Sequence, residues 1–172
     1  VLDPFSGGGT TPLAAAQRGL LSSYCELNPL LQLLVASKSA ALTLSSEARD
    51  RLAVTLQILA DSVKTDVRKH QTDPRLALSY RQTFRGSEFF TPESFDLVLR
   101  LRTWLDDVAC SEPLASDIAS IAVCASLVPV SHLIRRGDLR FRKGTSETSA
   151  RIENLLDEVS RRLIDMATDL AR

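Results

Sequence analysis

The sequence predicts an α/β chain, in which a truncated β-turn-α-β unit over residues 1–44 is followed by a mostly α-helical region over residues 45–172. Three observations predict this division. Residues 1–5 form a short apolar entry that leads into a glycine cluster and then a helix start. Strand signals nearly vanish after Leu27, and from there apolar residues recur at intervals of three and four, as on one face of a helix.

The first four elements follow one another closely. Residues 1–5 predict a strand and residues 6–9 a tight glycine turn, and the helix that begins at Thr10 has a proline near its start and a glycine at its end. Residues 20–27 predict a second strand. An Asn-Pro pair then ends that strand and opens a helix over residues 30–42. The predicted order is therefore β, α, β, α.

Four helical runs are predicted in the second region. The first begins after Ser45 or Ser46, and the other three cover about residues 92–109, 114–133 and 152–170. Polar connectors separate them at residues 71–74, 85–92 and 137–149. Two strands do not complete a parallel sheet of the usual about five or six strands. We therefore expect the missing strands to lie outside this chain.

Composition narrows the class of protein. Apolar residues make up 44% and charged residues 24% of the 172, with 21 basic and 21 acidic side chains, which is typical of a globular chain. No apolar run reaches the roughly 18 residues of a membrane span. The cysteines are odd in number, and the three of them, Cys25, Cys110 and Cys124, lie far apart in the sequence. This pattern fits a reducing, cytoplasmic compartment. His70 and His132 lack metal-ligand spacing, so no metal site is expected.

The glycine cluster has the chemistry of a nucleoside-cofactor turn. Gly7, Gly8 and Gly9 let a ligand approach the backbone, and the helix from Thr10 offers free N–H groups to a carboxylate or phosphate. Glu26 stands 17 residues beyond Gly9, close to the about 20 residues expected for an acidic side chain that accepts hydrogen bonds from a ribose. A purely structural turn is the alternative.

The run Asp-Pro-Phe-Ser-Gly-Gly-Gly-Thr-Thr over residues 3–11, with Glu-Leu-Asn-Pro at 26–29, resembles the S-adenosyl-L-methionine motif of amino-group DNA methyltransferases, Asp-Pro-Phe-x-Gly-x-Gly-Thr-Thr. The resemblance covers residues 1–39 in detail. It implies a truncated Rossmann-like methyltransferase fragment that carries a helical insert. The implied cofactor-binding residues are Asp3, Phe5, Gly7 and Gly9 at the methionine end, Thr10 and Thr11 at the helix start, Glu26 at the ribose and Leu27 near the adenine.

The function implied is part of a site-specific DNA methyltransferase that acts on adenine N6 or cytosine N4, with DNA as the partner of the intact protein. A restriction endonuclease partner is left open. An RNA guanine N2-methyltransferase has a similar turn, and Thr10-Thr11 favours the DNA type by resemblance only. A non-catalytic cofactor-binding or interaction module is the alternative from a different class.

Related enzymes grip the target amine with Asp, Asn or Ser followed by Pro-Pro and an aromatic residue. All seven prolines of this sequence are isolated, so no catalytic residue is assigned. We expect the parent protein to continue past Arg172 into a strand that ends in such a motif. The 172 residues alone are expected to transfer no methyl group.

One segment is strongly basic. Arg140, Arg142 and Lys143, with Phe141 among them, are the candidate nucleic-acid contacts. The alternative places Arg135 and Arg136 at the end of the apolar helix, where cations favour the helix dipole, and makes the rest a solvated loop.

Overall fold

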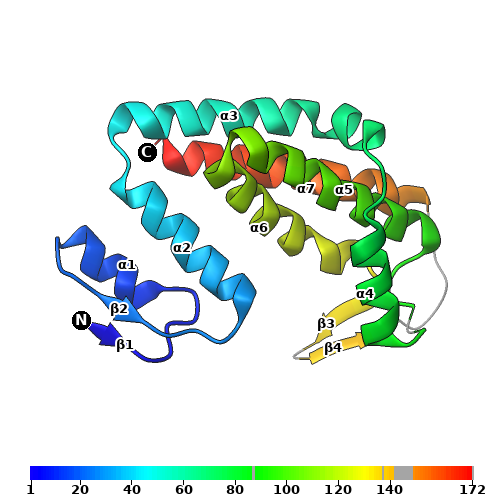
Figure 1. Ribbon diagram of the computed structural model, residues 1–172, viewed down its shortest axis with the longest axis horizontal. Coiled ribbons are helices and arrows are strands. Elements are labelled where there is room, and N and C mark those ends of the chain that lie inside the picture. Colours follow the sequence, from blue (N-terminus) through cyan, green and yellow to red (C-terminus); the bar gives the residue numbers. More distant parts are fainter. Residues whose placement is uncertain (87, 137, 142–148, 172) are drawn as a thin grey trace.

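A computed structural model describes residues 1–86, 88–136, 138–141 and 149–171. A helical bundle and a smaller N-terminal segment are distinguished in Figure 1. The elements, in order, are β1 (Leu2–Asp3), α1 (Thr10–Gln17), β2 (Ser23–Tyr24), α2 (Pro29–Thr43), α3 (Ser46–Asp66), the 3₁₀ helix η1 (Val67–Lys69), α4 (Pro74–Phe84), α5 (Pro92–Ser111), α6 (Pro113–Val130), β3 (Leu133–Arg136), β4 (Asp138–Phe141) and α7 (Ser149–Leu170).

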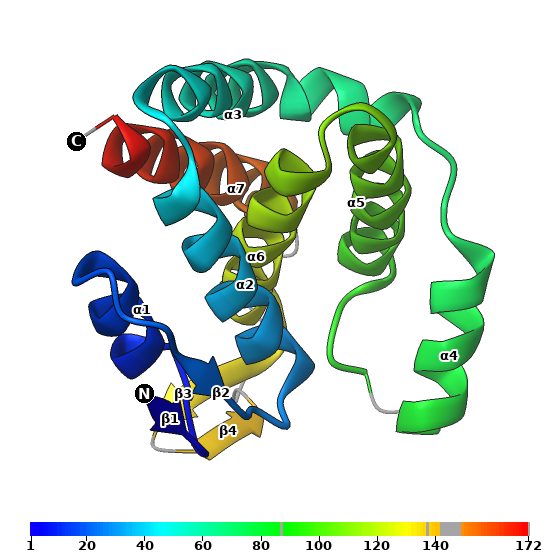
Figure 2. The same cartoon turned by 60° about the vertical axis from the view of Figure 1, so that its left-hand side comes forward.

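The core lies among α3, α5, α6 and α7. Helices α3 and α7 run antiparallel and side by side, and α6 passes beneath them (Figures 1 and 2). Each helix contributes one apolar stripe, as the spacing of three and four predicts. The fully buried side chains include Leu56 and Val63 of α3, Leu101 of α5, Val130 of α6, and Leu155, Val159 and Leu163 of α7. Trp104 is 3% exposed and packs within this core.

Side-chain caps explain where several helices begin. Asn28 Oδ1 accepts the Leu30 N–H at 3.0 Å at the start of α2, and Ser45 Oγ accepts the Ala48 N–H at 3.2 Å at the start of α3. Thr91 and Asp73 cap α5 and α4 in the same way. Each satisfies an amide that has no partner within its helix. Pro29, Pro74 and Pro92 then occupy first helical positions, where a proline loses no hydrogen bond.

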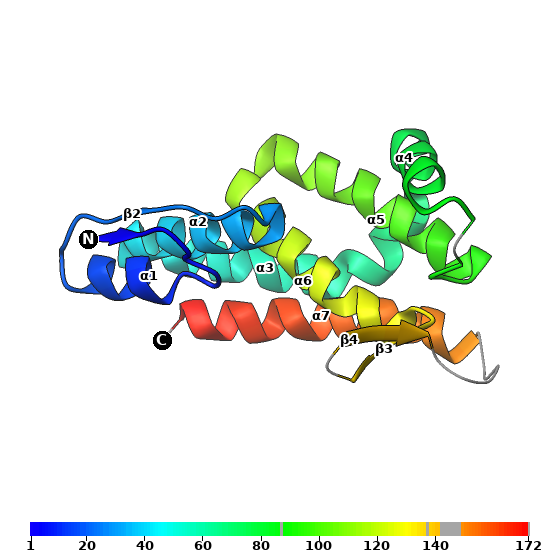
Figure 3. The same cartoon turned by 90° about the horizontal axis from the view of Figure 1, so that it is seen from below.

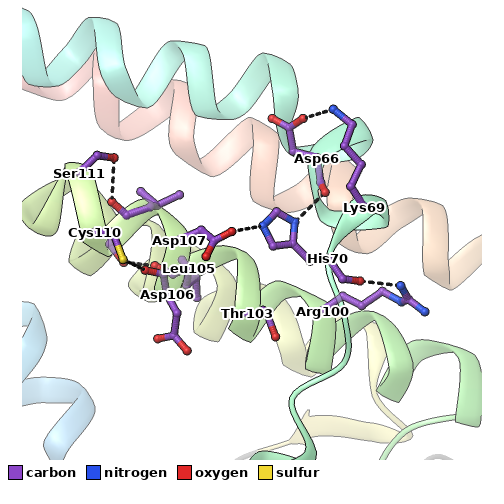
Figure 4. Close-up of polar contacts among 12 residues, drawn as sticks. Asp66, Lys69, His70, Arg100, Thr103, Leu105, Asp106, Asp107, Cys110 and Ser111 are labelled. Carbon is purple, nitrogen blue, oxygen red and sulfur yellow. Dashed lines mark hydrogen bonds and ion pairs between the residues drawn. The ribbon is translucent and has the colours of Figure 1, made fainter.

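A polar cluster fastens the end of α3 and η1 to α5 (Figure 4). The His70 ring lies between two oxygen acceptors, with Nδ1 2.8 Å from the Asp66 carbonyl and Nε2 2.9 Å from Asp107 Oδ2. Arg100 donates to the His70 carbonyl at 2.6 Å. Because these contacts join η1 to α5, they fix the direction in which the chain leaves the bundle toward α4.

The N-terminal segment is attached to the bundle through α2, which packs on α6 and also on α1. Val35 of α2 is fully buried, and Ala15 of α1 is nearly so. Strands β1 and β2 are parallel, with Leu2 paired with Ser23 and Asp3 with Tyr24. The segment lies at one end of the molecule, beside the lower half of α2 (Figure 1).

The expected α/β class with a truncated Rossmann-like core is wrong. Among the described residues the only parallel pairing is the two-residue match of β1 with β2, and the rest of the chain is dominated by helices. The predicted strands at 1–5 and 20–27 shorten to two residues each because no neighbouring strand continues the ladder among the described residues. The mostly helical second region is confirmed.

Three further differences concern the helices and the basic segment. Helix α4 was not predicted, although Asp73-Pro74 is a helix-start signal. Helix α6 ends at Val130, and the basic segment that follows contains the antiparallel β3–β4 hairpin, so Arg135 and Arg136 lie in β3 and not at a helix end.

Helix α6 is also long and apolar enough to span a membrane by length and composition alone. Eight of its residues are buried within the bundle, including Ala115, Ala119 and Ala122, as in the core helix of a globular domain.

Candidate cofactor-binding turn

The glycine turn lies at the end of the short parallel pair. The Ser23 N–H donates to the Val1 carbonyl at 2.8 Å, and the Cys25 N–H donates to the Asp3 carbonyl at 2.9 Å. The Ser6 N–H then donates to the Cys25 carbonyl at 3.1 Å. These bonds place residues 6–9 next to the segment that follows β2.

Two glycines in the turn have backbone conformations that side chains disfavour. Gly7 has φ +50° and Gly9 has φ +85°, and the Gly9 N–H closes the turn on the Ser6 carbonyl at 2.8 Å. A Cβ atom at Gly9 would lie 2.7 Å from Cγ2 of Val35, whereas one at Gly7 or Gly8 would meet nothing within 4 Å. Gly9 therefore allows α1 to approach α2, and the space over Gly7 and Gly8 is open.

The Glu26 carboxylate bridges this turn to α2. Its Oε2 atom accepts the Gly7 N–H at 2.9 Å, and its Oε1 atom accepts the Asn28 N–H at 2.7 Å. Gln32 donates to the Glu26 carbonyl and helps to hold the residue in place. A carboxylate has about four acceptor positions, so two amides leave acceptor capacity for a ligand.

The other predicted site residues surround this contact. Asp3 Oδ1 accepts the Phe5 N–H at 3.1 Å, and the Phe5 side chain is 90% exposed. Thr10 and Thr11 open α1 and are exposed, and Gly9, the N-cap, supplies no side-chain cap. The first amides of a helix have no partner within it, so this end attracts an anion.

Leu27 is 97% exposed and lies beside a wide, open groove between the end of β2 and α2. Glu26 and Leu33 also line this groove. Of the eight predicted cofactor-binding residues, Asp3 ends β1 and Phe5, Gly7 and Gly9 follow it. Thr10 and Thr11 open α1, and Glu26 and Leu27 come just after β2.

Two residues near the turn were not predicted from the sequence. Lys38 reaches from α2 to the Gly8 carbonyl, with 3.4 Å between Nζ and the oxygen. Ser6 is 7% exposed, and its Oγ atom has no hydrogen-bond partner among the described residues. A buried hydroxyl without a partner is costly, which makes Ser6 a candidate ligand contact. Neither role has a local signal, because both depend on how the folded chain packs around the turn.

The candidate nucleic-acid contacts are only partly described. Arg140 is exposed on β4, opposite Ile134 of β3, while Arg142 and Lys143 lie outside the described residues. Phe141, next to Arg140, stacks on Phe89 with ring centroids 5.5 Å apart. The described residues hold no group of three or more His, Cys, Asp or Glu side chains arranged to bind a metal ion.

Comparison with known proteins finds no relative of this chain. No protein-family model matches the chain, and no curated protein or solved structure matches it either.

Proposed function

We propose that the N-terminal turn of this protein binds S-adenosyl-L-methionine, and that the protein is part of a DNA methyltransferase acting on adenine N6 or cytosine N4. The observation that carries the proposal is the 2.9 Å hydrogen bond from the Gly7 amide to the Glu26 carboxylate. It joins the two halves of the motif, which lie 19 residues apart. The proposal rests on this turn and requires no larger sheet among the described residues.

The residues present fit the cofactor in five respects. The space over Gly7 and Gly8 is open, the buried Ser6 hydroxyl has no partner among the described residues, and Glu26 retains acceptor positions for two ribose hydroxyls. The start of α1 supplies a positive dipole end for the amino-acid carboxylate. Leu27 provides an exposed apolar surface for the adenine. When bound, this cofactor supplies a methyl group on a positively charged sulfur.

In this proposal the chain's own residues bind and orient the cofactor, and they do not activate the target amine. The sequence has no Pro-Pro-aromatic motif to hold an extruded base, so no described residue receives a catalytic role. Arg140 is the described residue proposed to contact a DNA phosphate.

Calorimetric titration of the full-length protein tests the proposal. Glu26→Gln removes the negative charge but keeps a hydrogen-bonding side chain, and it should weaken S-adenosylmethionine binding by about 1 to 3 kcal/mol, the range for a hydrogen bond to a charged group. Glu47→Gln is the matched control, because Glu47 is an exposed glutamate of α3 that pairs with Arg51.

Adenosine and 2′,3′-dideoxyadenosine sharpen the test. If Glu26 holds the ribose hydroxyls, Glu26→Gln should weaken adenosine binding and leave binding of the dideoxy compound unchanged. An equal effect on both compounds would mean that Glu26 only shapes the turn. Undetectable binding of S-adenosylmethionine to the folded full-length protein would refute the proposal. Binding without methyl transfer to DNA or RNA would favour the non-catalytic module.

A further inference from the structure

A second cavity lies at the opposite end of the molecule from the glycine turn. It measures about 710 Å³ and is lined by α4, α5, α6 and the β3–β4 hairpin. Figures 2 and 3 show α4 standing to one side of α5. Protein interiors are packed without voids of this size, and ligand sites have volumes of about 300 to 1,000 Å³.

Three helical stripes face the cavity. Helix α4 presents residues spaced by four, α5 residues spaced by three or four, and α6 a stripe of five. The lining residues of these stripes are Leu76, Tyr80 and Phe84 of α4, Phe95, Val98, Arg102 and Leu105 of α5, and Ser120, Val123, Cys124, Leu127 and Val128 of α6. Within the described residues α4 buries none of its side chains fully, because its apolar face borders the cavity instead of another helix.

Aromatic rings dominate the wall. Five of the six phenylalanines in the sequence line this cavity together with Tyr80. The rings of Tyr80 and Phe95 have centroids 4.4 Å apart, and those of Phe89 and Phe141 are stacked within 11° of parallel. Phe84 and Phe141 are 42% and 55% exposed, which leaves ring surface available at the cavity edge. A planar aromatic ligand matches such a wall better than an alkyl chain, since ring pairs gain from stacked and edge-to-face contacts.

The polar groups of the wall restrict the ligand further. Tyr80 Oη accepts the Phe89 N–H at 3.2 Å, and Ser131 Oγ donates to the Val128 carbonyl at 2.8 Å. The surrounding apolar groups raise the pKa of the Cys124 thiol, which keeps it neutral. Arg102 is the only charged side chain among the described lining residues. Its Nη1 atom pairs with Asp106 at 2.5 Å, and a guanidinium has five N–H donors in all, so it can also hold one anionic group.

We propose that the cavity between α4, α5 and α6 binds a small planar aromatic molecule with a single anionic group, whose rings stack among the phenylalanines and whose anion pairs with Arg102. The proposal is independent of the cofactor proposal, because the cavity shares no residue with the glycine turn. It also accounts for the loose packing of α4.

Two fluorescent probes test it with the full-length protein. 1-Anilinonaphthalene-8-sulfonate has fused rings and one sulfonate, and N-phenyl-1-naphthylamine is its uncharged analogue. We expect one site for the sulfonate probe. Arg102→Met should weaken its binding about tenfold, the effect of a lost charge-assisted hydrogen bond, and leave the uncharged analogue unaffected.

Variants that fill the cavity give the complementary result. Cys124→Trp should abolish binding of both probes, and Ser120→Phe serves the same purpose if the first variant unfolds, which circular dichroism would show. Leu20→Ser and Leu21→Ser remove exposed apolar surface from the N-terminal segment, outside the glycine turn, and are the controls for non-specific binding. The proposal is overturned if probe binding follows these control variants, if several weak sites are titrated, or if a folded cavity-filling variant binds the probes as the natural protein does.

Discussion

The helical bundle and the N-terminal segment place their apolar side chains in opposite environments. In the bundle, Leu56 and Leu101 are completely buried, whereas Leu21 and Leu27 of the N-terminal segment are more than nine-tenths exposed. The bundle helices bury their apolar stripes against one another. The short parallel pair has no such partner among the described residues, although parallel strands are normally covered on both faces. The bundle helices therefore form most of the buried apolar core, whereas the N-terminal segment leaves several large apolar side chains exposed.

The largest expected difference between the two regions is in how much the free energy of unfolding falls when one leucine side chain is removed from each. Leu101→Ala leaves a cavity in the core and should lower the free energy of unfolding by about 2 to 5 kcal/mol. Leu21→Ala removes an exposed side chain and should change it by less than about 0.5 kcal/mol. Urea unfolding followed by helical circular dichroism measures both. Equal losses of unfolding free energy would contradict the contrast between a buried core in the bundle and exposed leucines in the N-terminal segment.

The two positive-φ glycines of the turn provide a comparison within the N-terminal segment. Gly9→Ala places a Cβ atom against Val35 in a left-handed backbone, and we expect it to destabilise the segment by about 2 to 3 kcal/mol. Gly7→Ala places a side chain in the same left-handed backbone but without the contact with Val35, so we expect it to destabilise the segment by about 1 to 2 kcal/mol. Hydrogen exchange at the Ser23 and Cys25 amides, which pair β2 with β1, reports the loss.

Val35→Ala supplies the control for this pair. In that background the two closest methyl groups are gone and the nearest remaining atom, the Cβ at position 35, is 3.3 Å away, so the cost of Gly9→Ala should fall toward that of Gly7→Ala. An unchanged cost would show that backbone conformation alone makes Gly9 necessary.

A smaller effect on the free energy of unfolding is expected from Asp73, the residue that caps the start of α4. The Leu76 amide, together with that of Arg75, donates to Asp73 and holds the pKa of this carboxyl below its ordinary value of 3.8. Because the pKa is lower in the folded protein, the stabilisation is fully present above about pH 4 and is lost as the pH falls through the folded value.

Asp73→Asn retains a cap but does not titrate. Its unfolding free energy should therefore fall less steeply with acid than that of the natural protein, by about 0.5 to 1 kcal/mol between pH 5 and pH 3. Asp73→Ala should lose about 1 kcal/mol even at neutral pH. Parallel acid profiles for the natural protein and Asp73→Asn would mean that Asp73 does not act as a charged cap.

The helices of the bundle could be predicted because each carries its signals locally. Caps such as Ser45 and the spacing of Leu52, Leu56 and Val63 depend only on neighbouring residues. Helix α4 was not predicted because it is short and because its few apolar residues are separated by polar ones. The strand prediction at 20–27 was wrong in extent for a different physical reason: apolar residues form a strand only where other strands supply hydrogen-bond partners.

The candidate site shows the same limit. The spacing between Gly9 and Glu26 indicated that they serve one site, and Glu26 does lie against Gly7. The contributions of Ser6 and Lys38 could not be predicted, because the burial of Ser6 and the reach of Lys38 from α2 to Gly8 are set by tertiary structure. The aromatic cavity also depends on tertiary structure, since its phenylalanines are spread from residue 84 to residue 141.

Hydrogen exchange of the full-length protein, with and without saturating S-adenosylmethionine, tests most directly whether the N-terminal turn is the cofactor site. We predict that the cofactor slows exchange at the amides of Gly7, Thr10 and Thr11 and of the segment that follows Glu26, and leaves exchange in α3 and α7 unchanged. The same experiment on Glu26→Gln should show weaker protection at the turn. Protection confined to the helical bundle, or to the aromatic cavity beside α4, would contradict the account.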